Sequence, residues 1–170
     1  MTSGVEIRRE RTSDVEAIGQ VIDAAFSGMP YADGDEAELV EALRSQGALS
    51  ISLVAEREGT IVGQIAFSPA QASGGAAGWY ALGPLAVLPA HQGGGIGSAL
   101  VRTGLRAIGE RGASGCILTG DPAYYSRFGF TPSRASAPPG EPAEFFMVKL
   151  LRGKLPGGPI LFHEAFGGAD

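Results

Sequence analysis

A cluster of glycines stands where an apolar run gives way to a helical pattern, and its composition is typical of an anion site. Residues 92–97 read Gln-Gly-Gly-Gly-Ile-Gly, which is the pattern Q-x-x-G-x-G. The first turn of a helix has backbone N–H groups without partners inside the helix, and the helix dipole makes that end positive. Glycine lets a bulky anion approach these groups and allows unusual backbone dihedral angles. We therefore expect this loop to bind a phosphate or pyrophosphate group.

Two familiar phosphate loops do not fit this stretch. A Walker loop requires a lysine after its last glycine, and no lysine follows here. A dinucleotide fingerprint requires G-x-G-x-x-G, but the third position is Ser98 when counted from Gly93 and Leu100 when counted from Gly95. A turn that merely joins a strand to a helix is the remaining alternative. Four glycines within residues 93–97 exceed what a short connection needs and carry an entropic cost, so we prefer the anion site, with the Ser98 hydroxyl as a further donor.

The elements that must position this loop follow from hydrophobic periodicity and from glycine and proline breaks. Strands are expected over residues 5–10, 51–58, 60–70, 79–88, 115–120 and 143–151, and helices over residues 12–26, 35–47, 97–111 and 122–129. Gly59 predicts a hairpin between the second and third strands. Ser13, with Glu16 three residues later, is typical of a capping box that starts the first helix. The order β-α-α-β-β-β-α-β-α-β predicts an α/β (α+β) fold with a mixed sheet and a central β-α-β crossover.

Composition and charge exclude several classes of protein. The chain has 170 residues, of which 44% are hydrophobic and 18% charged, so we expect one folded domain over residues 1–170. The formal net charge is −5, and lysines and arginines do not cluster, so a nucleic-acid partner is not expected. Two histidines and one cysteine show no metal-ligand spacing, so no metal is expected.

The compartment is predicted from cysteine usage and from the absence of targeting signals. Cys116 is the single cysteine, so no disulfide can form within the chain, which fits a reducing cytoplasm. The first ten residues lack the apolar region of a signal peptide, and no apolar stretch is long enough to span a bilayer. We therefore expect a cytoplasmic protein without a membrane partner.

Two motifs together make the chain resemble the GNAT superfamily of N-acetyltransferases. Residues 85–101, LAVLPAHQGGGIGSALV, are similar to the acetyl-coenzyme A binding motif of that family, [Q/R]-x-x-G-x-[G/A]. Residues 124–130, YYSRFGF, are similar to its second motif, in which an aromatic residue stands four places before the glycine of a final Gly-Phe pair. The element order also matches, over residues 5–151. The tail after residue 151 would then be a C-terminal extension.

The resemblance implies a GNAT-like acyl-CoA acyltransferase fold and a binding mode for acetyl-coenzyme A. Two neighbouring strands, over residues 80–88 and 115–120, would run parallel and then splay apart in a central sheet flanked by helices. The pantetheine arm would lie in that wedge, against the backbone of Leu85, Ala86 and Val87. The pyrophosphate would be bound by the loop and the first helical turn, which comprise Gln92, Gly93, Gly94, Gly95, Ile96, Gly97 and Ser98. Pro84 cannot donate a hydrogen bond to a neighbouring strand, so it indicates either the place where the two strands splay apart or simply the start of the strand over residues 80–88 after a turn.

The resemblance also implies direct transfer of the acetyl group to a primary amine. Negative charge builds on the thioester oxygen, and a backbone N–H near residues 85–87 would stabilise it. The leaving thiolate needs a proton, and Tyr125 stands at the family's position for that general acid, four residues before Gly129. The structural alternative is that Tyr125 only packs on the cofactor or the core. Tyr124 is the natural control residue.

Several assignments stay open at this point. Glu56 and Asp121 are candidates for a general base, but we prefer structural roles for both, as a hairpin charge and a helix cap. The acceptor amine, on a small molecule or a protein, is not identified by the sequence, because loops build acceptor pockets. The acidic residues between 33 and 41 would suit a cationic amine.

A different class of function and the oligomeric state are open as well. The alternative to an enzyme is a non-catalytic acyl-CoA binding or sensing module on the same fold, which would keep the loop but would not need Tyr125. Dimers are common in the family, so a homodimer is one of the states that the resemblance allows.

Overall fold

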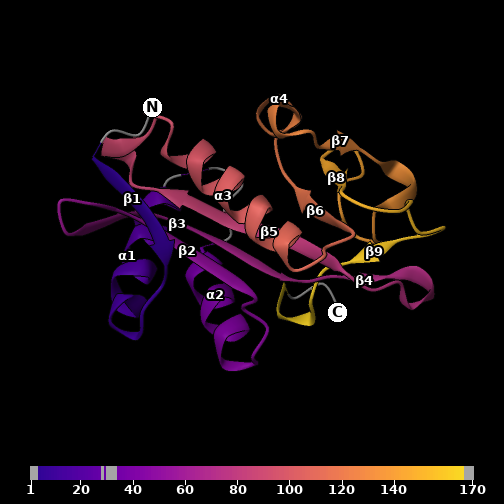
Figure 1. Ribbon diagram of the computed structural model, residues 1–170, viewed down its shortest axis with the longest axis horizontal. Coiled ribbons are helices and arrows are strands. Elements are labelled where there is room, and N and C mark those ends of the chain that lie inside the picture. Colours follow the sequence, from indigo (N-terminus) through magenta and orange to yellow (C-terminus); the bar gives the residue numbers. More distant parts are fainter. Residues whose placement is uncertain (1–3, 28, 30–33, 167–170) are drawn as a thin grey trace. The chain divides into compact units, whose positions relative to one another are not determined.

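The strands and helices expected from the sequence are present in a computed structural model of the chain, which describes residues 4–27, 29 and 34–166 (Figure 1). The expected strands are β1 Val5–Arg9, β2 Ile51–Arg57, β3 Thr60–Pro69, β5 Trp79–Val87, β6 Gly115–Thr119 and β8 Phe146–Leu150. The expected helices are α1 Val15–Phe26, α2 Glu36–Ser45, α3 Ile96–Glu110 and α4 Pro122–Tyr125. Three strands of two residues each were missed, namely β4 Gln71–Ala72, β7 Thr131–Pro132 and β9 Ile160–Leu161. The mixed α/β fold is therefore confirmed, with small strands added.

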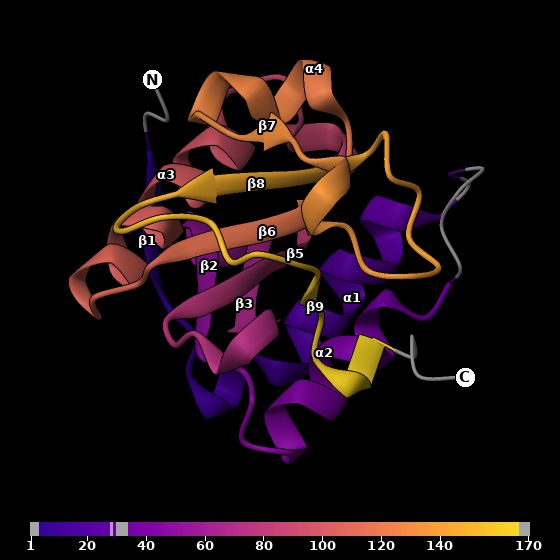
Figure 2. The same ribbon diagram turned by 90° about the vertical axis from the view of Figure 1, so that its right-hand side faces the viewer.

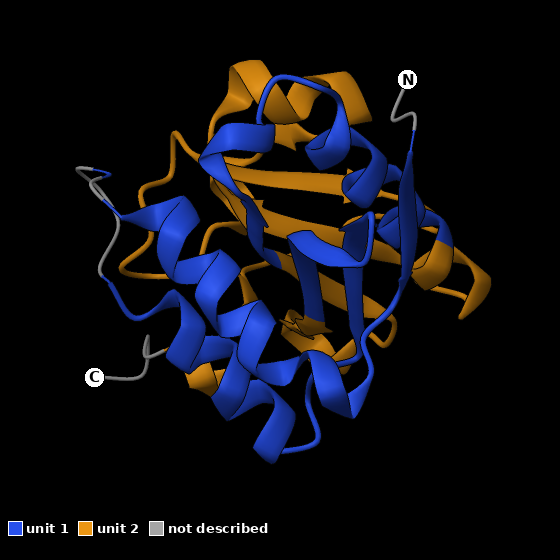
Figure 3. Ribbon diagram, turned by 90° about the vertical axis from the view of Figure 1, so that its left-hand side faces the viewer, with its two compact units in different colours: residues 1–67, 83–106 blue, residues 68–82, 107–170 orange. Residues whose placement is uncertain are grey.

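The chain divides into two compact units, which are described separately (Figure 3). Unit 1 comprises Met1–Phe67 and Gly83–Arg106, and unit 2 comprises Ser68–Leu82 and Ala107–Asp170. The strands are hydrogen-bonded in the order β1-β2-β3-β5-β6-β8-β7, and β4 pairs with β9 in a second sheet. The chain passes between the units within β3, within β5 and within α3, so each unit holds part of all three elements.

In unit 1, the helices cover both faces of the first three strands (Figure 1). β1 and β3 both pair antiparallel with β2, and the turn at Gly59 confirms the predicted hairpin. α1 and α2 lie on one face, where alternate strand residues meet the apolar side of each helix. This core contains Ile18, Val21, Ile22, Val40, Val54, Ala66 and Ala86, all at most 3% exposed.

The other face of unit 1 carries the first turns of α3, and two glycines let that helix lie close to β3. A Cβ atom on Gly63 of β3 would stand 3.1 Å from Leu100 of α3. A Cβ atom on Gly104 of α3 would overlap the ring of Phe67, which is fully buried. The close contact fixes the position of the residues that begin α3.

The start of α1 differs from the prediction, because Asp14 and not Ser13 stands at its N-cap. A short 3-10 helix, η1 Thr12–Asp14, precedes α1 and leaves Ser13 exposed. The Asp14 carboxylate accepts hydrogen bonds from the Arg11 amide at 2.7 Å and from the Arg8 guanidinium at 2.7 Å. These bonds close the 3-10 helix η1 and not α1, to which the Asp14 side chain makes no capping bond, so α1 begins after η1 and the predicted capping box of Ser13 and Glu16 does not form.

In unit 2, β6 pairs parallel with the first three residues of β5 and antiparallel with β8, which also pairs with β7 (Figure 2). The core on one face of these strands contains Trp79, Ile117, Phe146, Val148 and Ile160. Gly115 is required there, since a Cβ atom would stand 2.5 Å from the Trp79 ring. Across the described residues, no helix is both long and apolar enough to cross a membrane.

Candidate active site

The glycine loop, residues 93–97, lies in unit 1 between the end of β5 and the start of α3. A 3-10 helix, η3 Pro89–His91, turns the chain after β5, and α3 begins at Ile96. Gly93 and Gly95 have φ angles of +83° and +88°, in the left-handed region that favours glycine. The expectation that unusual dihedral angles require glycine is therefore confirmed at these two positions.

The backbone amides of this loop are free to bind a ligand. Among the backbone hydrogen bonds of the described residues, none is donated by the amides of residues 93–98. The first amide of the helix that donates is that of Ala99, which bonds the Gly95 carbonyl at 3.0 Å. Gly93, Gly94 and Gly95 are exposed, and a Cβ atom on Gly93 would meet nothing within 4 Å. A row of free amides at the positive end of a helix fits an anionic group.

Side chains tie this loop to the neighbouring strands. The Gln92 amide nitrogen donates to the Val87 carbonyl at 3.0 Å, so two residues predicted to bind the cofactor contact each other. Arg57, at the end of β2, lies 2.9 Å from Nδ1 of His91. Because a guanidinium can only donate, Nδ1 of His91 is the acceptor in this bond. No pattern in the sequence indicates the Arg57–His91 contact, since the two residues belong to distant segments.

At the end of β5, the side chains of residues 86 and 87 face the interior. Ala86 and Val87 are buried, and Leu85 is half-buried. Pro84 follows a cis peptide bond from Gly83 and lies inside β5, five residues after the strand begins at Trp79. The alternative that Pro84 merely starts the strand is therefore wrong. The parallel pairing of β5 with β6 that the family resemblance implies is confirmed over Trp79–Ala81, where it reaches Ile117.

Tyr125 lies in unit 2, at the end of α4, and its ring covers the end of β6. A Cβ atom on Gly120 would stand 2.7 Å from the ring, so glycine is required beneath it. The ring contacts Tyr124 edge-on, with the ring centres 4.9 Å apart, and Phe130 at 6.1 Å. Asp121 caps α4 by accepting from the Ala123 amide at 3.0 Å. The requirement for Gly120 was missed in the sequence, where this residue only closes an apolar run.

The electrostatic environment keeps the Tyr125 hydroxyl protonated. Burial raises the pKa of this phenol above its usual value, and Tyr124, Cys116 and Asp121 add to the shift. Among the described residues, no hydrogen bond to the Tyr125 hydroxyl is present. A protonated phenol without an internal partner can donate its proton to a bound ligand.

The two candidates for a general base have structural partners, as we expect. The Glu56 carboxylate accepts from Nε of Arg8 at 2.8 Å, beside the Arg8–Asp14 pair. Asp121 caps α4, as described above. Asp33, the first residue of the acidic run, lies outside the described residues, whereas Glu41 forms an ion pair with Arg44. Within the part of the chain that the structure describes, no group of acidic, histidine or cysteine residues could hold a metal ion.

Comparison with known proteins identifies similar chains. The family profile described as the acetyltransferase (GNAT) domain matches residues 48–132. The YhbS protein of Escherichia coli K12, described as an uncharacterized N-acetyltransferase, is 38% identical over 167 residues, which cover 94% of this chain and 97% of that protein. A second protein of this organism, YjhQ, has the same description and is 36% identical over 71% of this chain and 66% of its own length.

Two solved structures are similar over nearly the full length. A GNAT family acetyltransferase from Brucella melitensis, in complex with acetyl-CoA, has a TM-score of 0.85 and 44% sequence identity, and the match covers 95% of this chain and 97% of that one. YhbS from Escherichia coli, in complex with CoA, has a TM-score of 0.86 and 32% identity, with 98% and 93% covered.

Proposed function

Because the chain belongs to the GNAT family of acetyltransferases, we propose that it moves the acetyl group of acetyl-coenzyme A to a primary amine by direct transfer. The observation that carries this proposal is the row of free amides over residues 93–98 at the start of α3. The two similar structures hold acetyl-CoA and CoA, which supports the same ligand here.

The residues of unit 1 would bind the cosubstrate. The amides of residues 93–98 donate to the pyrophosphate, and the Ser98 hydroxyl adds a donor. The backbone of Leu85, Ala86 and Val87 pairs with the pantetheine arm, as the family resemblance implies. Gln92 supports this arrangement by holding the loop on the Val87 carbonyl. A backbone N–H of this strand then stabilises the charge on the thioester oxygen.

Tyr125 would complete the reaction from unit 2. The amine nitrogen attacks the thioester carbon, the C–N bond forms and the C–S bond breaks. The thiolate takes the proton of the Tyr125 hydroxyl, which burial keeps protonated. The proton lost by the amine passes to solvent, and the Tyr125 phenolate takes up a proton again before the next turnover. Glu56 and Asp121 are held by other partners and have no part in this scheme.

A panel of amines tests the proposed function. Acetyl-coenzyme A is incubated with the protein and with primary amines of several classes, including polyamines, aminoglycosides and peptides with free N-termini or lysines. Release of free thiol above the hydrolysis background is the expected result for at least one class. If coenzyme A binds but no amine stimulates thiol release, the non-catalytic acyl-CoA binding module is supported instead.

Three further properties remain predictions. We propose that residues 1–170 act as one domain, that the protein is cytoplasmic, and that a homodimer is one of its accessible states.

A further inference from the structure

Arg57, at the end of β2 in unit 1, is held by a side chain that leaves its positive charge intact. The Arg57 guanidinium donates to Nδ1 of His91 at 2.9 Å, and both residues are half-buried. A histidine nitrogen that accepts a hydrogen bond carries no proton, so the imidazole of His91 is neutral in this contact. The contact therefore fixes the place of the Arg57 guanidinium without neutralising it.

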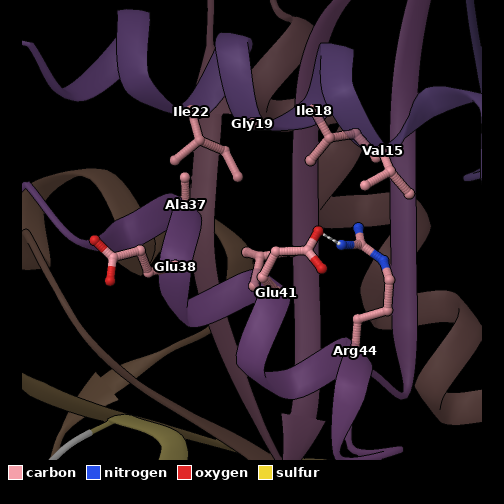
Figure 4. Close-up of a pocket in the computed structure, with 9 residues that line it drawn as sticks. Val15, Ile18, Gly19, Ile22, Ala37, Glu38, Glu41 and Arg44 are labelled. Atoms are coloured by element: carbon pink, nitrogen blue, oxygen red, sulfur yellow. Dashed lines mark hydrogen bonds and ion pairs between the residues drawn. The ribbon is translucent and has the colours of Figure 1, made fainter.

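Two other arginines of unit 1 are held in a different way, by carboxylates. Arg44 forms ion pairs with Glu10 and Glu41, the second of which is drawn in Figure 4, and Arg8 likewise pairs with two carboxylates. Among the residues that the structure describes, no carboxylate forms an ion pair with Arg57, although one glutamate precedes it and another follows it in the sequence. The charge of Arg57 is therefore available to an anionic ligand.

The held guanidinium belongs to the surroundings of the glycine loop. His91 ends η3, and Gly93, the first glycine of the loop, follows two residues later. Consecutive Cα atoms are 3.8 Å apart, so the Cα atoms of His91 and Gly93 lie within about 8 Å of each other. The free amides of residues 93–98 are neutral donors. A charged donor beside them would strengthen the binding of an anion, because charge-assisted hydrogen bonds are about twice as strong as neutral ones.

The shape of the guanidinium also suits a phosphate group. A guanidinium carries five N–H donors in a planar fork, which matches two oxygens of one phosphate. Among the described residues, His91 provides the one side-chain acceptor that Arg57 contacts. The remaining N–H groups of Arg57 are thus left for a ligand.

We propose that Arg57, held in place by the neutral imidazole of His91, binds a phosphate group of acetyl-coenzyme A. The inference rests on the proposed function, because it assigns a further residue to the same cosubstrate. Arg57 lies outside both sequence motifs, which assign the phosphates to the backbone and the Ser98 hydroxyl alone.

Titration calorimetry with coenzyme A, at equal ionic strength for all variants, tests the proposal. Arg57→Gln should weaken coenzyme A binding at least about tenfold, as expected for the loss of one hydrogen bond from a charged group. Arg57→Lys keeps the charge but loses the planar fork, so its loss of affinity should be smaller. Arg106→Gln is the control, since it removes an exposed arginine of α3 about 15 Å along the helix from Ile96. This control should bind as the wild type does.

The dependence on salt separates a charge contact from a packing role. Raising the NaCl concentration from about 50 mM to about 500 mM should narrow the difference in affinity between the wild type and Arg57→Gln, because salt screens the attraction between charges. A difference that does not change with salt would overturn the proposal, because loss of packing alone would produce it.

Dephospho-coenzyme A, which lacks the 3′-phosphate, identifies the phosphate group that Arg57 binds. Equal binding of this ligand by the wild type and Arg57→Gln would assign Arg57 to the 3′-phosphate. A loss as large as the loss with coenzyme A would assign it to the pyrophosphate. Either result supports a phosphate contact.

His91→Ala tests whether the histidine acts through Arg57. This variant should weaken coenzyme A binding by less than Arg57→Gln does, because the guanidinium is still present but is no longer held. In the double variant, the loss should equal that of Arg57→Gln alone, since His91 then has nothing to hold. Additive losses would overturn this role of His91.

The failure of this proposal differs from the failure of the proposed function. Equal coenzyme A affinity of the wild type and Arg57→Gln would overturn the assignment of Arg57. Absence of coenzyme A binding by the wild type would instead contradict the proposed function. The melting temperature without ligand should be similar in all variants. If Arg57→Gln melts at a much lower temperature, the salt dependence of Arg57→Lys against Arg106→Gln carries the test.

Discussion

At the residue scale, the Tyr125 hydroxyl is the group on which the proposed chemistry depends. Tyr125→Phe keeps the ring over Gly120 and its contact with Phe130, and removes only the hydroxyl. We expect turnover to fall about 10²-fold, which is within the range for loss of a general acid. Coenzyme A affinity should stay nearly constant, because the packing survives. Steady-state kinetics with a good acceptor and calorimetry with coenzyme A measure the two effects.

Tyr124→Phe is the control, since Tyr124 has the same ring, lies edge-on to Tyr125 and has the Arg127 guanidinium over its own ring. This variant should turn over as the wild type does. Full turnover by Tyr125→Phe under conditions where chemistry limits the rate would remove Tyr125 as the acid. An equal loss of coenzyme A affinity in both variants would show that Tyr124 and Tyr125 serve only to pack the structure.

The ionisation of Asp14 makes the free energy of unfolding depend on pH. The hydrogen bond from Arg8 above all lowers the pKa of the Asp14 carboxyl below its usual 3.8, and burial opposes this effect only in part. Because the folded pKa lies below the unfolded one, the stabilisation is complete above about pH 5 and is lost as the pH falls through the folded pKa.

Asp14→Asn should therefore lower the free energy of unfolding by about 2 kcal/mol at pH 7, and by clearly less at pH 3. Urea denaturation at both values measures this difference, and Asp23→Asn, an exposed site on α1, is the control. A deficit of equal size at pH 7 and pH 3 would contradict the assignment.

At the element scale, the proposed anion binding by the glycine loop can be tested with two variants that differ only in the charge of one side chain. Gly93→Asp and Gly93→Asn both place a side chain in open space at a φ angle of +83°, which these two residues tolerate better than most others. The backbone strain of the two variants is therefore similar. The variants differ by one negative charge at the place where the pyrophosphate is proposed to bind. We expect Gly93→Asp to weaken coenzyme A binding at least about tenfold more than Gly93→Asn does, in calorimetry at equal ionic strength. Equal affinities in the two variants would show that the anion binds elsewhere.

The elements also show how far the sequence could predict this fold. Periodicity identifies α1 and the hairpin of β2 and β3, because a 3.6-residue and a two-residue repeat mark one buried face each. The start of α3 is shifted by one residue, to Ile96. The strands β4, β7 and β9 are too short to carry a repeat, and β7 consists of Thr131 and Pro132. The predicted N-cap of α1 was wrong because Asp14, bound to Arg8 and to the Arg11 amide, closes the 3-10 helix η1 ahead of α1.

The candidate site was predictable to a similar extent. Glycine spacing identifies the loop, because free amides and positive φ angles are local properties of a strand-to-helix turn. The bond from Gln92 to Val87 was not predictable because it depends on the short turn η3, which has no marked pattern in the sequence. The contact of Arg57 with His91 was not predictable because it joins segments that are distant in the sequence. The contact of Arg57 with His91 joins the segment just before the glycine loop to the hairpin of β2 and β3, which carries no recognisable motif.

At the scale of the whole molecule, the proposed machinery draws on both compact units. Unit 1 holds the glycine loop and the end of β5, and unit 2 holds Tyr125, which ends α4 with its ring over Gly120. Binding of the phosphate groups and protonation of the thiolate are thus assigned to different parts of the chain. Variants of Gly93 should act on affinity and variants of Tyr125 on turnover, so the two sets of measurements separate these roles.

Ligand selectivity is the property of the whole molecule that separates the proposed function from a general phosphate site. A ligand that binds the native state alone raises its stability, by about 2.7 kcal/mol at a concentration of 100 Kd. For a chain of this size we expect acetyl-coenzyme A at that concentration to raise the melting temperature by about 5–10 °C. ATP and NAD offer phosphates to the amides of residues 93–98 but no pantetheine arm to the backbone of Leu85, Ala86 and Val87. At the same concentration they should therefore shift the melting temperature far less, and Gly93→Asp should reduce the shift from acetyl-coenzyme A. Equal shifts in melting temperature from NAD and acetyl-coenzyme A would show that the loop recognises phosphate groups alone. The assignment of the β5 backbone to pantetheine would then be wrong.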